Sequence, residues 1–420
     1  MIGVIGFIKK HKLWIIFFLT LALHIFLRFY QLEIRSFFSW DQVDTAWKTK
    51  EIILDNKFPL LGPAARWGSG IFIGPAYVYI GALFYFLTNL DPIASGIFAG
   101  VVSIVSFFTI FWVTKKIFSN EVALIAVIMN TVSFSAIQFD RIQWEVNFVP
   151  IISLILFYAL YKIIIDRKEK YVFLLSFILG SAFHGHLTTA VFLPIITIFS
   201  LPLFPWSRKL IKYCIFSLPL FLIWLVPIAI AVISTSLVQH SANYTSTSLH
   251  GFHFRRFTQL TGDAFIEFQT FFRVSGIGSY LKFLFLPAFY IIYYLKSGKK
   301  SIVFFYLIFL WYIVPWVVFA LYSGEISNYY FSINRPISLI IISYLAVRSF
   351  QYKNYLMRSA LIIFAVYYSF TNLYLFSERK YDSLYNYRAF VKTAIKNGVK
   401  IEYKEGDPKS YLYYIYTRKK

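Results

Sequence analysis

The residues with the clearest capacity for chemistry are carboxylates that stand next to long apolar runs. Asp41 lies in the segment Ser39-Trp40-Asp41-Gln42-Val43-Asp44, shortly beyond the first apolar run. A carboxylate at the face of a membrane is costly, and it is therefore a functional candidate. In a partly dry site its pKa rises, and it can then accept a proton from a hydroxyl. The segment also fits a helix N-cap, in which Ser39 or Asp41 opens an amphipathic helix, and the two roles are compatible.

A second polar segment, residues 139–147, is very short and holds Asp140, Arg141, Trp144, Glu145 and Asn147. Because the apolar runs on both sides are so near, its two carboxylates must stay close to the helix ends. Arg141 can bind a phosphate or pair with Asp140. The alternative interpretation is an interfacial aromatic belt with a surface ion pair.

Histidines and arginines follow in two later segments. His184 and His186 are two residues apart and do not share a helical face, so we expect no metal site built on this pair alone. A hydrogen-bonding role, either towards a cavity or within the structure, fits these histidines better. Arg255 and Arg256 precede an amphipathic stretch, which predicts either a cradle for a lipid phosphate or simple anchoring at the headgroups.

A last polar segment, residues 324–336, places Glu325, Tyr329 and Arg335 between two apolar runs. These types can line the mouth of a site, or they can form an ordinary polar loop with interfacial tyrosines. Each of these signals is weak alone. The stronger observation is that the alternation of loops assigns all of them to one side of a membrane.

The elements that must position these residues are transmembrane helices. Hydrophobic residues make up 59% of the chain, aromatic residues 21% and charged residues 14%. Runs of about 17–25 apolar residues suit a hydrocarbon core of about 30 Å, and within it the backbone must be helical. We therefore predict an all-α polytopic membrane protein with about 11 transmembrane helices. The predicted crossings are 12–30, 91–114, 120–138, 146–165, 171–188, 189–204, 213–234, 281–296, 301–322, 333–350 and 357–376.

The net charge of +22 comes from short basic clusters between the apolar runs, as at Lys115 and Lys116. This placement is typical of cytoplasmic loops and argues against nucleic-acid binding. The polar segments then lie on the outer side. We expect the plasma membrane of a prokaryote, with the active site facing outwards. Cys214 is the only cysteine and lies in an apolar run, so disulfides and cysteine metal sites are not expected.

The predicted membrane domain spans 1–376. It contains a first outer loop at 31–90, which is the predicted catalytic loop, and a large outer loop at 235–280. Residues 71–88 are apolar enough to cross, but a crossing there would invert every later loop, so we interpret them as an interfacial helix. Residues 377–420 are predicted to form a small soluble α/β segment, with a helix near 383–397 and two short strands.

With these motifs in place, the sequence resembles the GT-C membrane glycosyltransferases, near the protein mannosyltransferase and aminoarabinose transferase groups. The resemblance covers roughly residues 10–200. The matching positions are Trp40-Asp41-Gln42, Gly74-Pro75 with Tyr77-Val78-Tyr79, Thr114-Lys115-Lys116-Ile117-Phe118, Arg141-Ile142-Gln143-Trp144 with Asn147 and Pro150, and His186-Leu187-Thr188-Thr189-Ala190.

The resemblance implies a GT-C fold with interfacial helices in the first outer loop. It implies that Asp41 is the general base, that Asp140 or Glu145 is the acid of the second loop, and that basic residues hold a phosphate leaving group. The family often has Asp-Glu where this chain has Asp41-Gln42, which puts a second acidic role at that position in doubt. The residues that the resemblance and the loop pattern assign to substrate binding are Trp40, Gln42, Asp44, Arg66, Arg141, Trp144, Asn147, His186, Arg255, Arg256, Glu325, Tyr329 and Arg335.

The leading hypothesis is an inverting glycosyltransferase that moves a sugar from a polyprenyl-phosphate carrier to an envelope glycan, lipid or protein. Membrane lipids are further expected partners. No protein metal ligand is predicted, although the resemblance leaves the participation of a divalent metal open. The alternatives are a polymerase or ligase for lipid-linked glycans, and a flippase without chemistry. A transporter would place charges near the bilayer midplane in two related halves, whereas these charges gather at one face.

Overall fold

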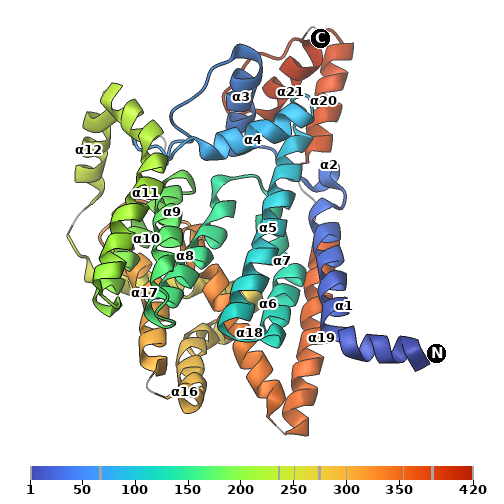
Figure 1. Ribbon diagram of the computed structural model, residues 1–420. Helices are drawn as coiled ribbons and strands as arrows, with labels where there is room; N and C mark the ends of the chain where they lie inside the picture. The colour runs from blue at the N-terminus through green and yellow to red at the C-terminus, as the bar shows by residue number, and fades with distance from the viewer. Residues whose placement is uncertain are drawn as a thin grey trace.

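Helices form nearly all the regular structure of this chain, as the computed structural model shows (Figure 1). The structure describes residues 2–65, 69–234, 237–249, 251–272, 276–298, 300–352, 354–379 and 383–418. Within them, extended segments meet only at three isolated bridges, Phe37 with Ser383, Ala64 with Phe72, and Leu249 with Tyr322. The prediction of an all-α architecture is confirmed.

The helix bounds follow in chain order. The first ten α-helices are α1 (Ile2–Phe29), α2 (Leu32–Arg35), α3 (Trp40–Asp55), α4 (Ala76–Leu87), α5 (Ile93–Ile117), α6 (Asn120–Val132), α7 (Phe134–Arg141), α8 (Val149–Ile164), α9 (Val172–Ser181) and α10 (Leu187–Ser200). The next are α11 (Arg208–Ser234), α12 (Leu237–Ser248), α13 (Phe254–Gln259), α14 (Thr261–Ala264), α15 (Ile266–Phe272), α16 (Phe285–Ser297), α17 (Lys300–Ala320), α18 (Arg335–Gln351), α19 (Tyr355–Glu378), α20 (Leu384–Lys396) and α21 (Pro408–Thr417). The 3₁₀ helices are η1 (Glu145–Phe148), η2 (Glu169–Tyr171), η3 (Ala182–His184), η4 (Leu201–Leu203), η5 (Gly276–Phe283) and η6 (Asn328–Asn334).

Seven helical segments of the described chain are long and apolar enough to cross a membrane. They are His11–Phe29, Ile93–Ile117, Glu145–Ile164, Arg208–Ser234, Ser301–Ala320, Asn328–Gln351 and Tyr355–Glu378, and each coincides with a predicted crossing. Three other predicted crossings, 171–188, 189–204 and 281–296, contain helices α9, α10 and α16, which are too short to meet this length by themselves. By length and composition, the described residues therefore contain seven such helices, or eight if the bent pair α6–α7 is one span, whereas the predicted eleven crossings also counted the shorter helices.

The eighth candidate is the pair α6–α7, which we predicted as one crossing over 120–138. The two helices meet at 70°. Ser133 breaks the helix with a ψ of 119°, and the Asn372 side chain accepts a hydrogen bond from the Phe134 backbone N–H at 2.8 Å. The bend turns the polar end of α7, with Asp140 and Arg141, into the bundle instead of out of it.

Helix α4 supports the interfacial interpretation of residues 71–88. Its 12 residues give a length of about 18 Å, well short of a hydrocarbon core of about 30 Å. In Figure 1 it lies across the end of the bundle, next to the start of α5. The helices α3, α20 and α21 gather at this same end, which we call the α3 end, while the α18–α19 connection lies at the opposite end.

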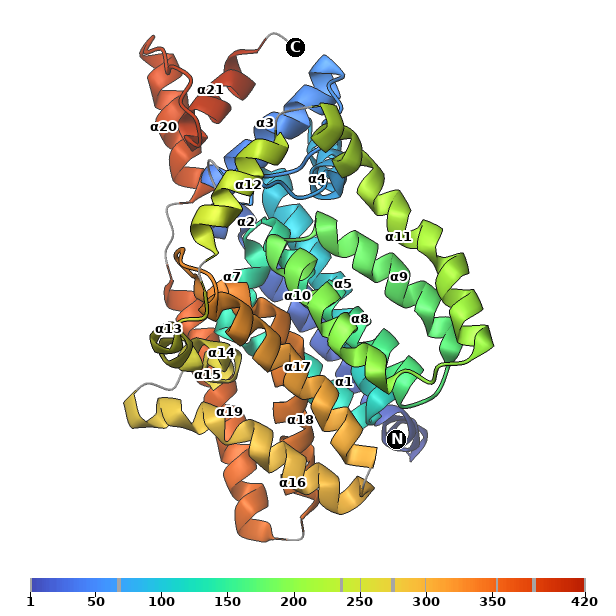
Figure 2. The same ribbon diagram turned by 90° about the vertical axis from the view of Figure 1, so that its left-hand side faces the viewer.

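The core includes a large apolar cluster between α5, α6, α8, α10, α17 and α18, a second cluster at the α3 end, and a smaller third cluster around Tyr77 and Phe98. In Figure 2, α9 and α11 run side by side along one flank and α16 lies at the end away from α3. The second cluster joins the first loop to the C-terminal segment. Its buried members are Phe38, Val43, Ala46, Tyr85, Leu90, Ala94, Leu384, Val391, Tyr411 and Leu412.

The predicted α/β character of the C-terminal segment is wrong. Helix α20 matches the predicted helix, but the segment predicted as a second strand is helix α21. Asp407 caps this helix by accepting a hydrogen bond from the Lys409 backbone N–H at 3.3 Å, and Pro408 occupies its first turn. Both are helix-start signals, and the burial of Tyr411 and Leu412 on one face overrides the strand preference of the aromatic residues.

Candidate active site

The first turn of α3 presents Asp41. Ser39 is the N-cap residue in an extended conformation, and its backbone N–H donates to the Gln42 Oε1 at 3.1 Å. Of the two predicted cap residues, Ser39 therefore has the cap position, and Asp41 is left with an accessible carboxylate. Partial desolvation by surrounding protein, together with the nearby charge of Asp44, raises the pKa of Asp41. Such a carboxylate is a better proton acceptor than an ordinary one.

Gln42 ties this turn of α3 to the second loop. Its side chain is 1% exposed, and its Nε2 donates to the backbone oxygen of Gln143 at 2.5 Å. The amide thus uses its oxygen on Ser39 and its nitrogen on Gln143. A glutamate cannot make the second bond in its ionised form. The glutamine at this position, where the resemblance would lead us to expect a glutamate, therefore has a structural reason in this chain.

Glu145 and His186 meet across the site from α3. The His186 Nε2 lies 4.0 Å from the Glu145 Oε1. The Thr188 backbone N–H donates to the His186 Nδ1 at 3.2 Å, so the proton of the neutral ring is on Nε2 and faces Glu145. Burial lowers the pKa of His186 to about 4. The charges of Asp41, Asp44 and Lys48 all reach Glu145, which places α3 and the second loop side by side.

Aromatic side chains enclose these groups. The rings of Trp144 and Tyr329 are 4.9 Å apart, and those of Tyr329 and His186 are 6.1 Å apart. Tyr329 lies within electrostatic reach of both Glu145 and Asp41. Of the predicted residues, the fold thus brings together Asp41, Asp44, Trp144, Glu145, His186 and Tyr329 from four distant parts of the sequence.

Three residues outside the predicted catalytic and substrate-binding sets belong to this site. Lys48 forms an ion pair with Asp44 at 2.6 Å, and its i,i+4 spacing was a readable signal. Tyr77 of α4 is 1% exposed; burial, and then the charges of Glu145 and Asp41, raise its pKa well above the ordinary value. Only the tertiary structure could place Tyr77 beside the two carboxylates.

The third is His184, which holds the beginning of α4. Its Nδ1 accepts a hydrogen bond from the Ala76 backbone N–H at 3.2 Å, and its Nε2 donates to the Trp224 oxygen at 2.6 Å. The Gly74 N–H donates to the Phe183 oxygen at 2.8 Å. A β-carbon on Gly74 would lie 2.2 Å from the His184 Nδ1, so only glycine permits this approach.

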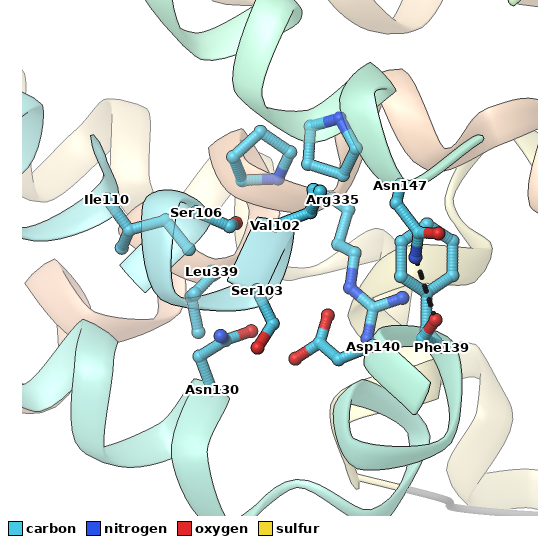
Figure 3. A pocket seen from close by; sticks show the side chains of 12 residues that line it. Val102, Ser103, Ser106, Ile110, Asn130, Phe139, Asp140, Asn147, Arg335 and Leu339 are labelled. Carbon is cyan, nitrogen blue, oxygen red and sulfur yellow. Dashed lines mark hydrogen bonds between the residues drawn. The ribbon is translucent and has the colours of Figure 1, made fainter. Parts of the chain in front are cut away.

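Asp140 does not lie among these groups. Its carboxylate accepts hydrogen bonds from Arg28 at 2.7 and 3.0 Å, and the Arg28 side chain is fully buried. Figure 3 shows Asp140 and Arg335 facing one small cavity, with Asn130 and Ser103 on the opposite side. Of the two predicted acids of the second loop, Glu145 is thus the one that faces Asp41, while Asp140 neutralises a buried arginine.

Arg335, the first residue of α18, also lies away from Asp41. Its guanidinium is 4.5 Å from the centroid of the Phe139 ring and 5.8 Å from that of Phe271. Glu267 is close enough for the Arg335 charge to oppose the burial that raises the pKa of this glutamate to about 7. The prediction that Arg335 lines the outer mouth does not fit this buried position.

Several other predicted substrate-binding residues hold the backbone instead. Arg141 donates to the oxygens of Leu27, Arg28 and Tyr30 at the end of α1, at 2.9, 2.9 and 3.0 Å. The Asn147 side chain donates to the Phe139 oxygen and accepts from the Trp144 N–H, which closes the second loop.

The remaining predicted positions lie in the later segments or beyond the described chain. Arg256 donates to the backbone oxygen of Phe319, in the last turn of α17, and to that of Gly324, beyond this helix. Arg255 and Glu325 are exposed. Arg66 lies outside the residues that the structure describes. Throughout the described ranges, no group of three or more histidine, cysteine, aspartate or glutamate side chains has a geometry that could hold a metal ion.

The fold is similar to that of solved GT-C membrane glycosyltransferases, and the predicted GT-C fold is thus confirmed. ArnT from Cupriavidus metallidurans bound to undecaprenyl phosphate has a TM-score of 0.56 and 10% identity, with 95% of this chain and 74% of that chain covered. The archaeal oligosaccharyltransferase AglB from Archaeoglobus fulgidus, in complex with an inhibitory peptide and a dolichol-phosphate, has a TM-score of 0.57 and 11% identity. That match covers 96% of this chain and 60% of AglB.

In sequence, residues 73–234 match the family described as Dolichyl-phosphate-mannose-protein mannosyltransferase. This region runs from the start of α4 through α11 and includes Glu145 and His186. No curated protein is significantly similar to the chain in sequence.

Proposed function

We propose that this protein is an inverting glycosyltransferase that transfers a sugar from a polyprenyl-phosphate carrier to an acceptor hydroxyl. The observation that carries the proposal is the meeting of Asp41 with Glu145, His186 and Tyr329 at the α3 end of a GT-C fold. Carboxylates with an accessible face, held between helix ends, suit a reaction between a membrane lipid and an acceptor outside the bilayer.

In this proposal Asp41 is the general base. It takes the proton from the acceptor hydroxyl while the acceptor oxygen forms a bond to the anomeric carbon of the sugar. The bond between that carbon and the phosphate oxygen breaks, its electron pair stays on the phosphate, and polyprenyl phosphate leaves. Attack opposite to the leaving group inverts the configuration. The raised pKa of Asp41 supports this role, because a base is most effective when its pKa approaches the working pH.

Glu145 and His186 are proposed to orient the sugar or the acceptor across from Asp41. The Nε2–H of His186 faces Glu145, with its nitrogen 4.0 Å from the carboxylate oxygen. Lys48 contributes positive charge on the same side and counters the charge of Asp44. Charged groups that the fold already holds in position stabilise the transition state, because the protein need not rearrange during the reaction.

The donor is proposed to be a lipid phosphate because the structural neighbours hold such carriers, undecaprenyl phosphate in ArnT and a dolichol-phosphate in AglB. We further propose that the α3 end faces the outside of a prokaryotic plasma membrane, since the basic connections cluster in the loops assigned to the cytoplasm. The acceptor hydroxyl in this proposal can belong to a glycan, a lipid or a protein.

The test uses the full-length protein in membranes with a panel of radiolabelled polyprenyl-phosphate sugars and envelope extract as acceptor. We expect label to move from the lipid to the acceptor, and Asp41→Asn to slow this transfer by about 10²- to 10⁴-fold. Asp55→Asn is the matched control, because it makes the same change at the other end of α3 and should transfer normally.

Normal transfer by Asp41→Asn would contradict the assignment of the base. Transfer only from a lipid diphosphate would instead support the polymerase or ligase hypothesis. A single cysteine in place of Lys57, which is exposed just beyond the end of α3, in a Cys214→Ser background, tests the side of the α3 end. Labelling by a membrane-impermeant thiol reagent only after permeabilisation would overturn the proposed orientation.

A further inference from the structure

The C-terminal pair α20–α21 packs on the elements that carry Asp41. Figures 1 and 2 show both helices at the α3 end of the molecule. Trp47 of α3 lies with its ring 5.1 Å from those of Tyr411 and Tyr414, and Phe38 lies 5.9 Å from Tyr411. Leu384, Val391, Tyr411 and Leu412 are fully buried in this contact. The pair α20–α21 is therefore packed against α3.

Arg388 of α20 joins the two ends of the first loop. Its Nη1 lies 3.2 Å from the Glu33 Oε1 in α2, and its Nη2 donates to the Asp91 Oδ1 just before α5. Glu33 precedes α3 and Asp91 follows α4, so one guanidinium clamps the segment that contains both helices. Its side chain is 17% exposed, which strengthens the pairing relative to a fully solvated ion pair.

The turn between α4 and α5 depends on the same C-terminal segment. Asn89 and Leu90 both have a positive φ, at 54° and 65°, which is a costly conformation for a leucine. Arg418 donates to the Asn89 oxygen at 2.9 Å, and the Tyr411 hydroxyl donates to the Leu90 oxygen at 3.0 Å. These bonds satisfy both carbonyl groups of the strained turn.

Gly406, in the connection between α20 and α21, lies directly against the residue before Asp41. Its φ is +69°, and a β-carbon built on it would lie 2.5 Å from the indole of Trp40. The Trp40 side chain is 58% exposed, and the Gly406 backbone packs against its ring. On the other side, Gln42 holds the same turn of α3 to the second loop.

We propose that the C-terminal pair α20–α21 is a positioning element of the active site, which fixes the first turn of α3 through the Gly406–Trp40 contact and the Arg388 clamp. The inference rests on the proposed function, because it assigns the reacting base to Asp41. Five residues make these two contacts, Arg388 with Glu33 and Asp91, and Gly406 with Trp40. None of them needs to touch the reacting atoms. They act on the reaction by setting the position of Asp41 relative to Glu145.

The test compares Gly406→Ala with Gly398→Ala in the full-length protein. Gly398 has the same φ of +69°, but a β-carbon there has no neighbour within 4 Å. Both variants therefore carry the same backbone strain, and only Gly406→Ala displaces Trp40. We expect Gly406→Ala to lower kcat by about tenfold or more, with KM for the donor little changed, because small misplacements of a reacting group cost up to about 10²-fold. Gly398→Ala should match the wild type in kcat.

A readout that needs no activity separates this inference from the proposed function. In a Cys214→Ser background, the rate of disulfide formation between Asp41→Cys and Glu145→Cys reports how well α3 and the second loop are aligned. We expect Gly406→Ala and Arg388→Gln to slow it, Gly398→Ala to leave it unchanged, and Arg388→Lys to restore part of it. Equal rates for Gly406→Ala and Gly398→Ala would overturn the inference. Crosslinking rates that follow this order, together with no sugar transfer by the wild-type protein, would overturn the proposed function alone.

Discussion

Replacing Gln42 by glutamate is the sharpest test of how α3 is held to the second loop. The change adds a charge and removes one hydrogen-bond donor while it keeps the size of the side chain. In the structure, the Gln42 Oε1 accepts from the Ser39 N–H at 3.1 Å, and its Nε2 donates to the Gln143 oxygen at 2.5 Å. An ionised glutamate in place of Gln42 keeps the first bond but puts a carboxylate oxygen against the Gln143 carbonyl oxygen.

The expected cost follows from burial, since Gln42 is 1% exposed. A buried polar atom that loses its partner costs about 1–3 kcal/mol, and a charged one costs more. We therefore expect Gln42→Glu to lower the free energy of unfolding by at least about 2 kcal/mol at pH 7.5. The cost should depend on pH, because the introduced carboxyl group, when protonated, can donate its O–H to the Gln143 oxygen.

The sign of that dependence follows from the pKa of the new side chain. Facing a carbonyl oxygen, the introduced carboxyl group should have a folded-state pKa above the ordinary value of about 4.3. Its penalty is then absent well below the ordinary pKa of about 4.3, grows as the pH rises from that value to the raised pKa, and is complete above it. A penalty of about 2 kcal/mol corresponds to a rise of about 1.5 pH units in that pKa.

Thermal or denaturant unfolding of the purified protein in detergent, at pH 5 and pH 7.5, measures this difference. Gln259→Glu is the matched control, because Gln259 is exposed on α13 and the same change there should stay within about 0.5 kcal/mol. Equal stability of Gln42→Glu and the wild type at pH 7.5 would refute the hydrogen-bond argument. So would a penalty of the same size at both pH values.

Three further predictions concern other contacts of the site. Asp140→Asn leaves the buried charge of Arg28 without its counter-ion and should lower stability by about 3–5 kcal/mol in the same unfolding assay. Gly74→Ala pushes a β-carbon to within 2.2 Å of the His184 ring and should cost about 1–3 kcal/mol and reduce transfer, since α4 begins there. For the reaction, kcat/KM should fall about tenfold per pH unit below the raised pKa of Asp41, because protonation removes the base.

Matched changes elsewhere in the chain provide the controls. Asp55→Asn breaks only a partly exposed ion pair and should cost less than about 1 kcal/mol. Gly251→Ala meets no neighbour within 4 Å and should be neutral. In Asp44→Asn the acid limb of the rate profile should move to lower pH, because the charge that helps to raise the pKa of Asp41 is gone. An unchanged limb would show that another group titrates.

Much of the fold could be predicted because its signals are local. The length of an apolar run decides whether a helix can cross a bilayer, and this length is readable residue by residue. The interfacial interpretation of 71–88 came from the alternation of loops, and the short length of α4 supports it. The prediction failed at α6–α7, where the break at Ser133 is supported by Asn372, a residue far away in the sequence.

The sequence by itself determined that Asp41 stands at the start of a helix next to a membrane face, and that a second carboxylate lies in a short loop. Only the tertiary structure decided between Asp140 and Glu145. Arg28, more than a hundred positions from Asp140, takes that carboxylate into a buried ion pair and leaves Glu145 for the site. The tertiary structure also shows that Arg141 and Arg256 donate to backbone carbonyl groups, and that Gly406 packs against Trp40. The physical reason is the same in each case: the partner that satisfies a buried charge or fills a contact is chosen by packing between distant segments, and no local pattern carries that information.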